Sequence, residues 1–221
     1  MKISFLPFDS NLFGYPVGKV EISNNWNEAE FLHSAKEFHL VYLFSENPLE
    51  VKTPKIKAVD TKLIFEKELL ANQQIIKGIE LYQQEKLNPK LQDLAFQSGV
   101  YSRFKIDRRL NHLEFEKLYS TWIQKAFDED FILTDSDLNG MITCSIQEEK
   151  ASIGLFAVSE KSKKTGLGTK LIQAAEETAQ INGGKSLLIA TQAANNAACK
   201  LYFKLGYQLL SSTSIFHYYN A

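Results

Sequence analysis

The chain has few cysteines and almost no excess of charge of either sign. Its 221 residues include two cysteines, Cys144 and Cys199, and 25 basic against 26 acidic side chains, for a formal net charge of -1. Two thiols need not pair, and we expect both to stay reduced, as in a cytoplasmic protein. A general nucleic-acid-binding protein would show a basic excess. We therefore expect no nucleic acid among its partners.

Long apolar runs are also missing. No stretch approaches the roughly 20 apolar residues that span a bilayer, and residues 1–9 lack the apolar core of a signal peptide. Repeats and low-complexity tracts are absent. We therefore expect a soluble, cytoplasmic protein with no membrane partner and no metal site. The length suits one well-packed domain, or a domain that carries a smaller one.

Hydrophobic periodicity predicts an α/β protein with a mixed sheet. Alternation and short apolar runs predict strands at residues 17–22, 40–44, 59–65, 141–146, 151–158, 186–190 and 208–219. Helical spacing predicts helices at residues 27–38, 91–97, 115–127, 168–181 and 195–205. The polar stretch 66–92 is the expected seam between an N-terminal part, 1–92, and a C-terminal part, 93–221. The β-β-α-β-α-β order of that second part implies helices packed on the mixed sheet.

Two glycines one residue apart, Gly166 and Gly168, lie between a predicted strand and a predicted helix. Glycine lets a ligand approach the main chain closely, and a helix N-terminus offers unpaired N–H groups and a positive dipole end to a phosphate. A glycine turn with a solvated basic face is the plainer alternative. The stretch is no Walker loop, and Leu171 stands where a dinucleotide fingerprint needs a third glycine.

A second pattern follows the buried strand at 186–190. It matches Asn-x-x-Ala-x-x-Leu-Tyr-x-x-x-Gly-Phe/Tyr of the GNAT acetyltransferases at six positions: Asn195, Ala198, Leu201, Tyr202, Gly206 and Tyr207. The glycine loop resembles that family's pyrophosphate pattern, Arg/Gln-x-x-Gly-x-Gly/Ala, with Lys163 in place of the usual Arg or Gln. The resemblance implies a GNAT fold and acetyl-CoA as co-substrate.

The resemblance also implies where the coenzyme is held. Its contacts come from the main chain of one strand, from the glycine loop and from the helix that follows the second motif: Phe156, Ala157, Val158, Lys163, Lys164, Thr165, Gly166, Leu167, Gly168, Thr169, Asn195 and Ala198. Asn195 implies an amide contact to the pantetheine arm. It also suits a plain helix N-cap, and both roles can hold together.

The catalytic residue that the resemblance implies is Tyr202. When an amine attacks a thioester, the departing thiolate needs a proton, and a nearby hydroxyl can supply it as a general acid. A tyrosine with its ordinary pKa of about 10 holds its proton at neutral pH and can still donate it. The alternative is a tyrosine that only packs its helix onto the sheet.

Further segments resemble a narrower group, the nucleotide-sugar N-acyltransferases similar to dTDP-fucosamine acetyltransferase. They are residues 9–18 (DSNLFGYPVG), 59–63 (VDTKL), 101–107 (YSRFKID), 118–123 (LYSTWI), 191–192 and 217. The narrower resemblance implies an amino-deoxysugar of the dTDP-4-amino-4,6-dideoxyhexose type as acceptor, for surface polysaccharide or glycan biosynthesis. It implies a partial GNAT-like N-terminal part packed on a complete C-terminal domain, with the acceptor between them, and it leaves a homodimer open.

Candidate acceptor contacts come from these segments: Asn11, Phe13, Tyr15, Arg103, Asp107, Gln192 and His217. Four cations within seven positions, Arg103, Lys105, Arg108 and Arg109, suit a sugar-nucleotide diphosphate, or form a solvated charged turn. We expect Asp107 either to hold Arg103 or to contact the sugar amine. His217 could relay protons, although a lone histidine near a C-terminal strand is more often structural.

Two other functions fit the sequence. The chain could be a GNAT enzyme that acts on another small amine or on a protein's amine, with residues 66–92 as a linker only. It could also be a non-catalytic CoA-binding sensor, against which the presence of Tyr202 argues.

Overall fold

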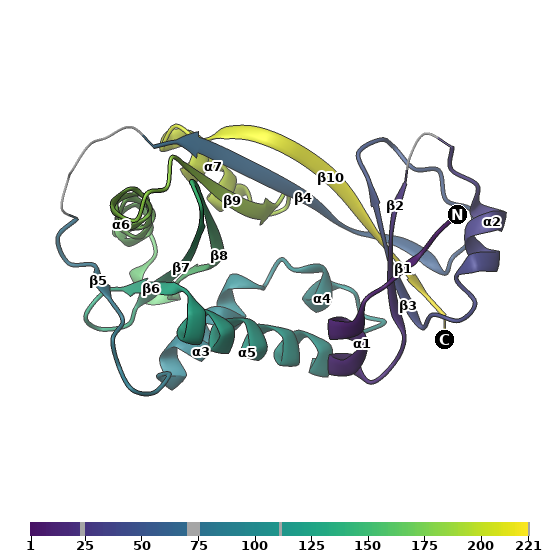
Figure 1. Ribbon diagram of the computed structural model, residues 1–221, viewed down its shortest axis with the longest axis horizontal. Helices are drawn as coiled ribbons and strands as arrows, with labels where there is room; N and C mark the ends of the chain where they lie inside the picture. Colours follow the sequence, from purple (N-terminus) through teal and green to yellow (C-terminus); the bar gives the residue numbers. More distant parts are fainter. Residues whose placement is uncertain (23–24, 70–75, 111, 221) are drawn as a thin grey trace.

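Ten strands form one continuous sheet in the computed structural model, which describes residues 1–22, 25–69, 76–110 and 112–220 (Figure 1). The spatial order is β1-β2-β3-β10-β4-β9-β8-β7-β6-β5. The strands are β1 (Ser4–Phe5), β2 (Val17–Ile22), β3 (Leu40–Ser45), β4 (Ile56–Glu68), β5 (Glu80–Leu81), β6 (Phe131–Thr134), β7 (Gly140–Gln147), β8 (Lys150–Val158), β9 (Ser186–Gln192) and β10 (Gln208–Tyr219). The mixed α/β class is confirmed.

Two long strands join the ends of the molecule. β4 lies between β9 and β10, antiparallel to both, and β10 pairs on its other edge with β3. Figure 1 shows both strands crossing from the part that holds α6 and α7 to the part that holds both termini. Strands from residues 1–92 and 93–221 are therefore neighbours in one sheet. The division of the chain at 92 stays a prediction.

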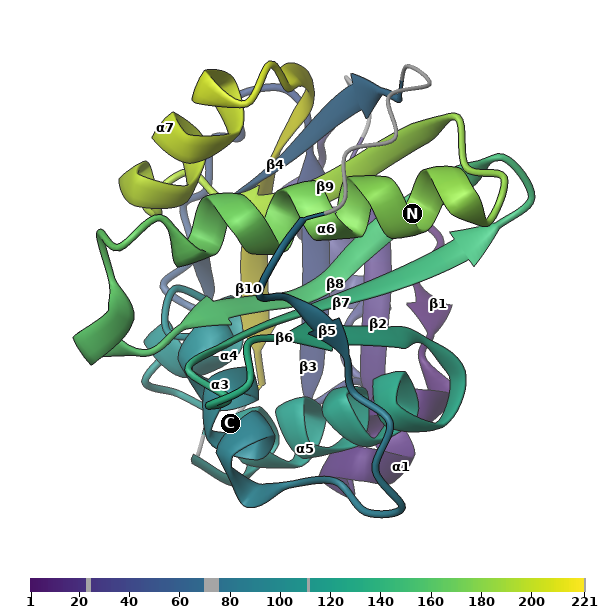
Figure 2. The same cartoon turned by 90° about the vertical axis from the view of Figure 1, so that its left-hand side faces the viewer.

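Helices cover both faces of the sheet. They are α1 (Pro7–Phe13), α2 (Glu28–Ser34), α3 (Pro89–Ser98), α4 (Arg103–Ile106), α5 (His112–Glu129), α6 (Leu167–Ile181) and α7 (Asn196–Lys204), with a 3-10 turn at Glu160–Ser162. α1, α3, α4 and α5 pack on one face, here the α5 face, through core residues such as Phe104, Leu118 and Leu155. α6 and α7 pack on the other, the α6 face, through residues such as Leu171 and Tyr202 (Figure 2).

Most predicted elements are present, and the differences have local causes. The helix expected at 27–38 ends at Ser34, because the chain turns there and Phe38 N bonds to Ala35 O at 3.0 Å. α1, α4, β1, β5 and β6 were not predicted, since the helices among them have at most seven residues and the strands at most four. None of the helices in the described ranges combines the length and apolar composition that a membrane crossing requires.

Candidate active site

β8 and β9 part halfway along their length. They are parallel neighbours from Lys150 to Ile153 and from Ser186 to Ile189, and the ladder stops there. β9 continues against β4 as far as Gln192, and β8 continues against β7 as far as Val158. The two facing edges beyond Ile153 and Ile189 therefore open as a wedge, in which main-chain groups are free to bond an extended ligand.

A β-bulge in β8 begins the wedge. Gly154 and Leu155 together face the single residue Thr143 of β7, and Leu155 N donates to Thr143 Oγ1 at 2.8 Å. Ile153 before the bulge packs on the α6 face, whereas Leu155 after it packs on the α5 face. An extra residue bends its strand and re-aims the side chains beyond it. This bend turns β8 away from β9.

The glycine loop lies at the mouth of the wedge. Gly166 has a φ of +88° and begins the 15-residue helix α6 without a side-chain cap, and no acidic residue stands in the first turn. Gly168 packs close to β8 and α7: a Cβ there would lie 3.4 Å from the Phe156 ring and 3.6 Å from Leu201. The uncapped N–H groups and the positive end of α6, beside the end of β8, have the properties that a phosphate site requires.

Two side chains of this loop already have partners within the protein, so they are less available to bind a phosphate than the sequence implied. Lys163 forms an ion pair with Glu160, and Thr165 Oγ1 donates to Ser162 O at 2.8 Å. Lys164 has a φ of +63° and is exposed. The main chain of 166–169, rather than these side chains, is the part of the loop that remains available to a phosphate.

Tyr202 lies where β8 and β9 part. Its ring packs 5.4 Å from that of Phe65, and Phe65 of β4 is the cross-strand partner of Ile189, the last β9 residue paired with β8. The side chain is 3% exposed, and burial, with Cys199 nearby, raises its pKa above the ordinary value. Tyr202 therefore keeps its proton at neutral pH. Asn195 Oδ1 accepts from Ala198 N at 3.3 Å, so the expected N-cap of α7 is confirmed.

The four cations expected to form one cluster do not act together. Arg109 donates to both Asp107 oxygens, to His217 O and to Lys55 O, and so joins α4 to β10. Lys105 and Arg108 are exposed, Lys105 over the Phe115 ring. Arg103 instead lies over the rings of Tyr42 and Phe44 in β3. The expectation that Asp107 holds Arg103 is wrong, because its carboxylate is taken by Arg109 and by His217 Nδ1, at 2.8 Å.

His217 is fully buried, and its surroundings keep it neutral. Burial lowers its pKa to about 4, although the hydrogen bond to Asp107 opposes this. Asp107 stays ionised, because hydrogen bonds from His217 and Arg109 outweigh its burial and hold its pKa well below the usual range. With Nδ1 donating to Asp107, Nε2 is the unprotonated nitrogen, and it has no partner in the described part of the chain.

Arg103 lies against aromatic rings on the α5 face. Its Cζ is 4.4 Å from the Phe104 ring centre, 4.8 Å from that of Tyr42 and 5.8 Å from that of Phe44. Nε is buried without a partner among the described residues. Burial lowers the pKa of the guanidinium, while Tyr42 and Asp60 nearby counteract this shift. Such a cation favours an anionic ligand group.

Two β4 side chains point toward Arg103 from the sheet. Asp60 and Lys62 alternate along the strand and so share the α5 face. Burial lowers the pKa of Lys62, as do Arg103 and Lys19. We call these four residues, Lys19, Asp60, Lys62 and Arg103, the charged cluster. Gln192, the expected acceptor residue at the end of β9, is the cross-strand neighbour of Lys62, so the cluster adjoins the wedge.

The remaining candidates lie beside the cluster or away from it. Phe13 is buried and packs 6.2 Å from Phe104, so it supports α4 rather than presenting a surface. Tyr15 donates to Glu114 Oε1 at 3.0 Å. Asn11 is exposed on α1. Asp60 and Lys62 belong to the 59–63 segment but were not predicted as site residues. Their period-two spacing on a predicted strand indicated that both lie on one face of the sheet.

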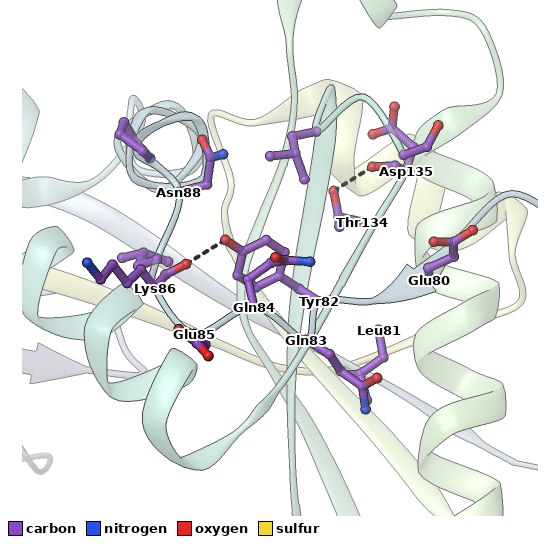
Figure 3. A pocket seen from close by; sticks show the side chains of 14 residues that line it. Glu80, Leu81, Tyr82, Gln83, Gln84, Glu85, Lys86, Asn88, Thr134 and Asp135 are labelled. Carbon is purple, nitrogen blue, oxygen red and sulfur yellow. Dashed lines mark hydrogen bonds between the residues drawn. The ribbon is translucent and has the colours of Figure 1, made fainter.

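Another cavity lies away from the wedge. It has a volume of about 930 Å³, and residues 80–89 line it together with four residues from Thr134 to Leu138, beside the short strand β5 (Figure 3). Tyr82 Oη there donates to Lys86 O at 2.7 Å. A smaller cavity of about 220 Å³ lies between α5 and the bulge, lined by Trp122, Thr143 and Leu155 among others. Only the smaller one adjoins the wedge.

Comparisons with known proteins agree with this geometry. Residues 91–207 match the model of the acetyltransferase (GNAT) family. Because the match spans more than half of the chain, the protein belongs to that family, whose members are acyltransferases. Among curated proteins nothing matches. In the ranges that the structure describes, no group of three or more His, Cys, Asp or Glu could hold a metal ion.

Solved structures show the same fold at low sequence identity. A GCN5-related N-acetyltransferase from Sphaerobacter thermophilus is 12% identical, with a TM-score of 0.55 over 97% of this chain and 75% of its own. A functionally unknown conserved protein from Staphylococcus epidermidis is 11% identical, with a TM-score of 0.58 over 96% and 89%. A GCN5-related N-acetyltransferase from Kribbella flavida is 11% identical, with a TM-score of 0.52 over 93% and 82%.

Proposed function

We propose that this protein transfers an acetyl group from acetyl-CoA to the amine of a nucleotide-linked amino-deoxysugar, of the dTDP-4-amino-4,6-dideoxyhexose type, for surface polysaccharide or glycan biosynthesis. The observation that carries the acyl-transfer part is the place of Tyr202, whose ring packs on Phe65 where β8 and β9 part. A protonated hydroxyl at that point suits a thioester that enters through the wedge.

The residues present fit acetyl-CoA as donor. The uncapped N–H groups of 167–169 suit its pyrophosphate, and the free edge of Phe156–Val158 suits the amide groups of its pantetheine arm. Gly168 at the start of α6 lies beside Phe156 of β8, so these two regions are neighbours. Bound acetyl-CoA supplies an acyl group on a thiolate leaving group. Tyr202 then donates its proton to the departing sulfur.

The charged cluster supports an anionic acceptor. Three of its members are cationic and one is acidic. Lys19 is paired with Glu21 at 2.9 Å, so Lys62 and Arg103 are the cluster's cations without an ion-pair partner among the described residues. The half-buried ring of Phe44, which contacts Arg103, offers apolar surface beside those cations. A nucleotide-linked sugar combines a diphosphate with an aromatic base, and Arg binds phosphate through paired N–H groups.

The test is a screen of acceptors with a free-thiol assay. Acetyl-CoA is held constant while dTDP-4-amino-4,6-dideoxyhexoses, the same amino sugars without the nucleotide, lysine peptides and simple amines are compared. We expect thiol release that depends on the dTDP-linked amine and falls at least about tenfold without the nucleotide, which is about 1.4 kcal/mol of lost transition-state binding. Equal rates with and without the nucleotide contradict the acceptor, and no acceptor-dependent release contradicts the transfer.

A further inference from the structure

Two arginines near α4 use their hydrogen-bond donors in opposite ways. Arg109 donates to the Asp107 carboxylate and to two main-chain carbonyl groups. No hydrogen bond or ion pair joins the Arg103 guanidinium to a described residue. Aromatic rings contact it instead, and that of Tyr42 has its centre 4.8 Å from Cζ. The N–H groups of Arg103 are therefore left to a ligand.

An unpaired guanidinium attracts the acids around it. Arginine and carboxylate form strong, often bidentate pairs, and a cation removed from water gains from such a partner. Burial lowers the pKa of Arg103, while Tyr42, Asp60 and Asp9 nearby counteract this shift. Both aspartates therefore act on the guanidinium, yet neither forms an ion pair with it in the described ranges. The groups that hold these acids in place also keep Arg103 free.

The Asp9 carboxylate is held by Tyr42. Asp9 lies in the first turn of α1, and Tyr42 is a residue of β3 that is 2% exposed. Tyr42 Oη donates to Asp9 Oδ2 at 2.8 Å. Burial and Asp9 raise the pKa of Tyr42, so the hydroxyl keeps the proton that it donates. One side chain thus contacts the cation with its ring and the acid with its hydroxyl.

We propose that Tyr42 is a positioning residue: its hydroxyl binds Asp9, keeps that carboxylate from pairing with Arg103, and so leaves the guanidinium free for a phosphate of the acceptor. The inference rests on the anionic acceptor proposed above. A hydrogen bond to a charged acceptor is stronger than one between neutral groups, so a single hydroxyl can hold the acid. It also adds no charge that would compete with Arg103 for the phosphate.

Asp60, the other acid near Arg103, is held by different means. It stands on β4, whose pairing with both β9 and β10 fixes the backbone around it. Asp9 stands on a helix of seven residues, so the place of its carboxylate depends more on the side chain that binds it. Removal of the Tyr42 hydroxyl should therefore release Asp9 and leave Asp60 where it is.

The experiment measures binding and requires no acetyl transfer. Calorimetry gives the Kd of two probes, dTDP and inorganic pyrophosphate, for wild type, Arg103→Ala and the variants below. We expect Tyr42→Phe to weaken the binding of dTDP about tenfold, which is about 1.4 kcal/mol, because the released Asp9 pairs with Arg103. Asp9→Asn in the Tyr42→Phe protein should return the Kd to within about threefold of wild type.

The matched control is Asp60→Asn in the Tyr42→Phe protein. It removes one negative charge near Arg103 and leaves Asp9 in place, so it should not restore binding. Asp60→Asn should change the Kd by the same factor with and without the Tyr42 hydroxyl, as independent sites do. A shift of the melting temperature by acetyl-CoA, retained in every variant, shows that the proteins fold and that the donor site is intact.

Three results overturn the inference: Tyr42→Phe binds dTDP within about twofold of wild type, Asp9→Asn fails to restore binding, or Asp60→Asn restores it equally well. Wild type that binds pyrophosphate more tightly than Arg103→Ala does, but acetylates no dTDP-linked amine, refutes the acceptor class alone. Equal Kd values for wild type and Arg103→Ala, or no binding of either probe, overturn both proposals.

Discussion

The backbone N–H of Leu155 donates a 2.8 Å hydrogen bond to Oγ1 of Thr143, the residue that faces the β8 bulge from β7. Both residues are buried. This bond occupies a main-chain donor that the bulge has removed from the regular ladder, and it therefore holds the bend that opens the wedge. Its removal leaves a buried N–H without a partner.

We expect Thr143→Val to destabilise the protein by about 1–3 kcal/mol, the cost of an unpaired buried donor. Valine keeps the shape and loses only the hydroxyl. Urea unfolding at equilibrium measures the change, and acetyl-CoA affinity should fall with it because the wedge loosens. Thr143→Ser keeps the acceptor and should lose less in both assays. Equal losses in the two variants would mean that packing, not this bond, holds the bulge.

The buried His217 predicts a pH-dependent stability. Its pKa falls from 6.5 to about 4 on folding, so the unfolded chain binds its proton first as the pH drops. Stability from the neutral histidine is present above about pH 6.5 and is lost toward pH 4, on the order of 3 kcal/mol. The pKa of Asp60 is raised, so its contribution to the free energy of unfolding changes with pH in the opposite direction over a similar pH range.

The comparison is therefore made between variants. In His217→Gln the free energy of unfolding should fall less toward acid pH than in wild type. In His33→Gln, at an exposed position on α2, it should fall as much as in wild type. Unfolding free energies at pH 7 and pH 4.5 measure the difference. A wild-type slope that survives in His217→Gln would contradict the lowered pKa of His217 in the folded protein.

Arg103→Ala should weaken binding of the acceptor and leave binding of acetyl-CoA unchanged. A lost charge-assisted contact costs on the order of 2 kcal/mol, or about thirtyfold in kcat/KM for the nucleotide sugar. Arg108→Ala, at an exposed cation of the same segment, is the matched control and should change little. Steady-state kinetics with each substrate varied in turn separates the two sites. A raised KM for acetyl-CoA with an unchanged acceptor KM would place Arg103 on the donor side.

Tyr202→Phe should lower kcat about 10²–10⁴-fold with little change in either KM, because the proton it donates is needed only in the transition state. Tyr207→Phe removes a hydroxyl from a ring 6.1 Å away in the same core and should keep its activity. The loss should shrink with a thioester whose thiol leaves more easily. A Tyr202→Phe enzyme within about twofold of wild-type kcat would leave Tyr202 as a packing residue.

Local patterns predicted much of the fold, and non-local pairing limited the rest. Period-two and helical spacing located the long elements, and α1 could have been found from Pro7 at its first position and Gly14 after its end. Nothing local shows that β4 pairs between β9 and β10, because that contact joins residues more than 100 positions apart.

The same limit applies to the site. The loop and Tyr202 lie in contiguous motifs, so they could be located directly. Gly154 inside a predicted strand was a signal of the bulge. Arg103, by contrast, contacts Tyr42 and lies near Asp60 only because three distant segments meet on the α5 face.

The central claim is that acetyl-CoA binds through the N-terminus of α6 and the wedge beside it. A ligand that binds only the folded state adds about 2.7 kcal/mol of stability at 100 times its Kd. The direct measurement is the shift in melting temperature on adding acetyl-CoA to wild type, Gly166→Glu and Gly183→Glu. Both glycines have a left-handed φ, +88° and +87°, with open space at the Cβ, but they stand at opposite ends of α6. We predict a shift in wild type and Gly183→Glu and none in Gly166→Glu; an unshifted wild type, or a Gly166→Glu protein that shifts normally, would contradict the site.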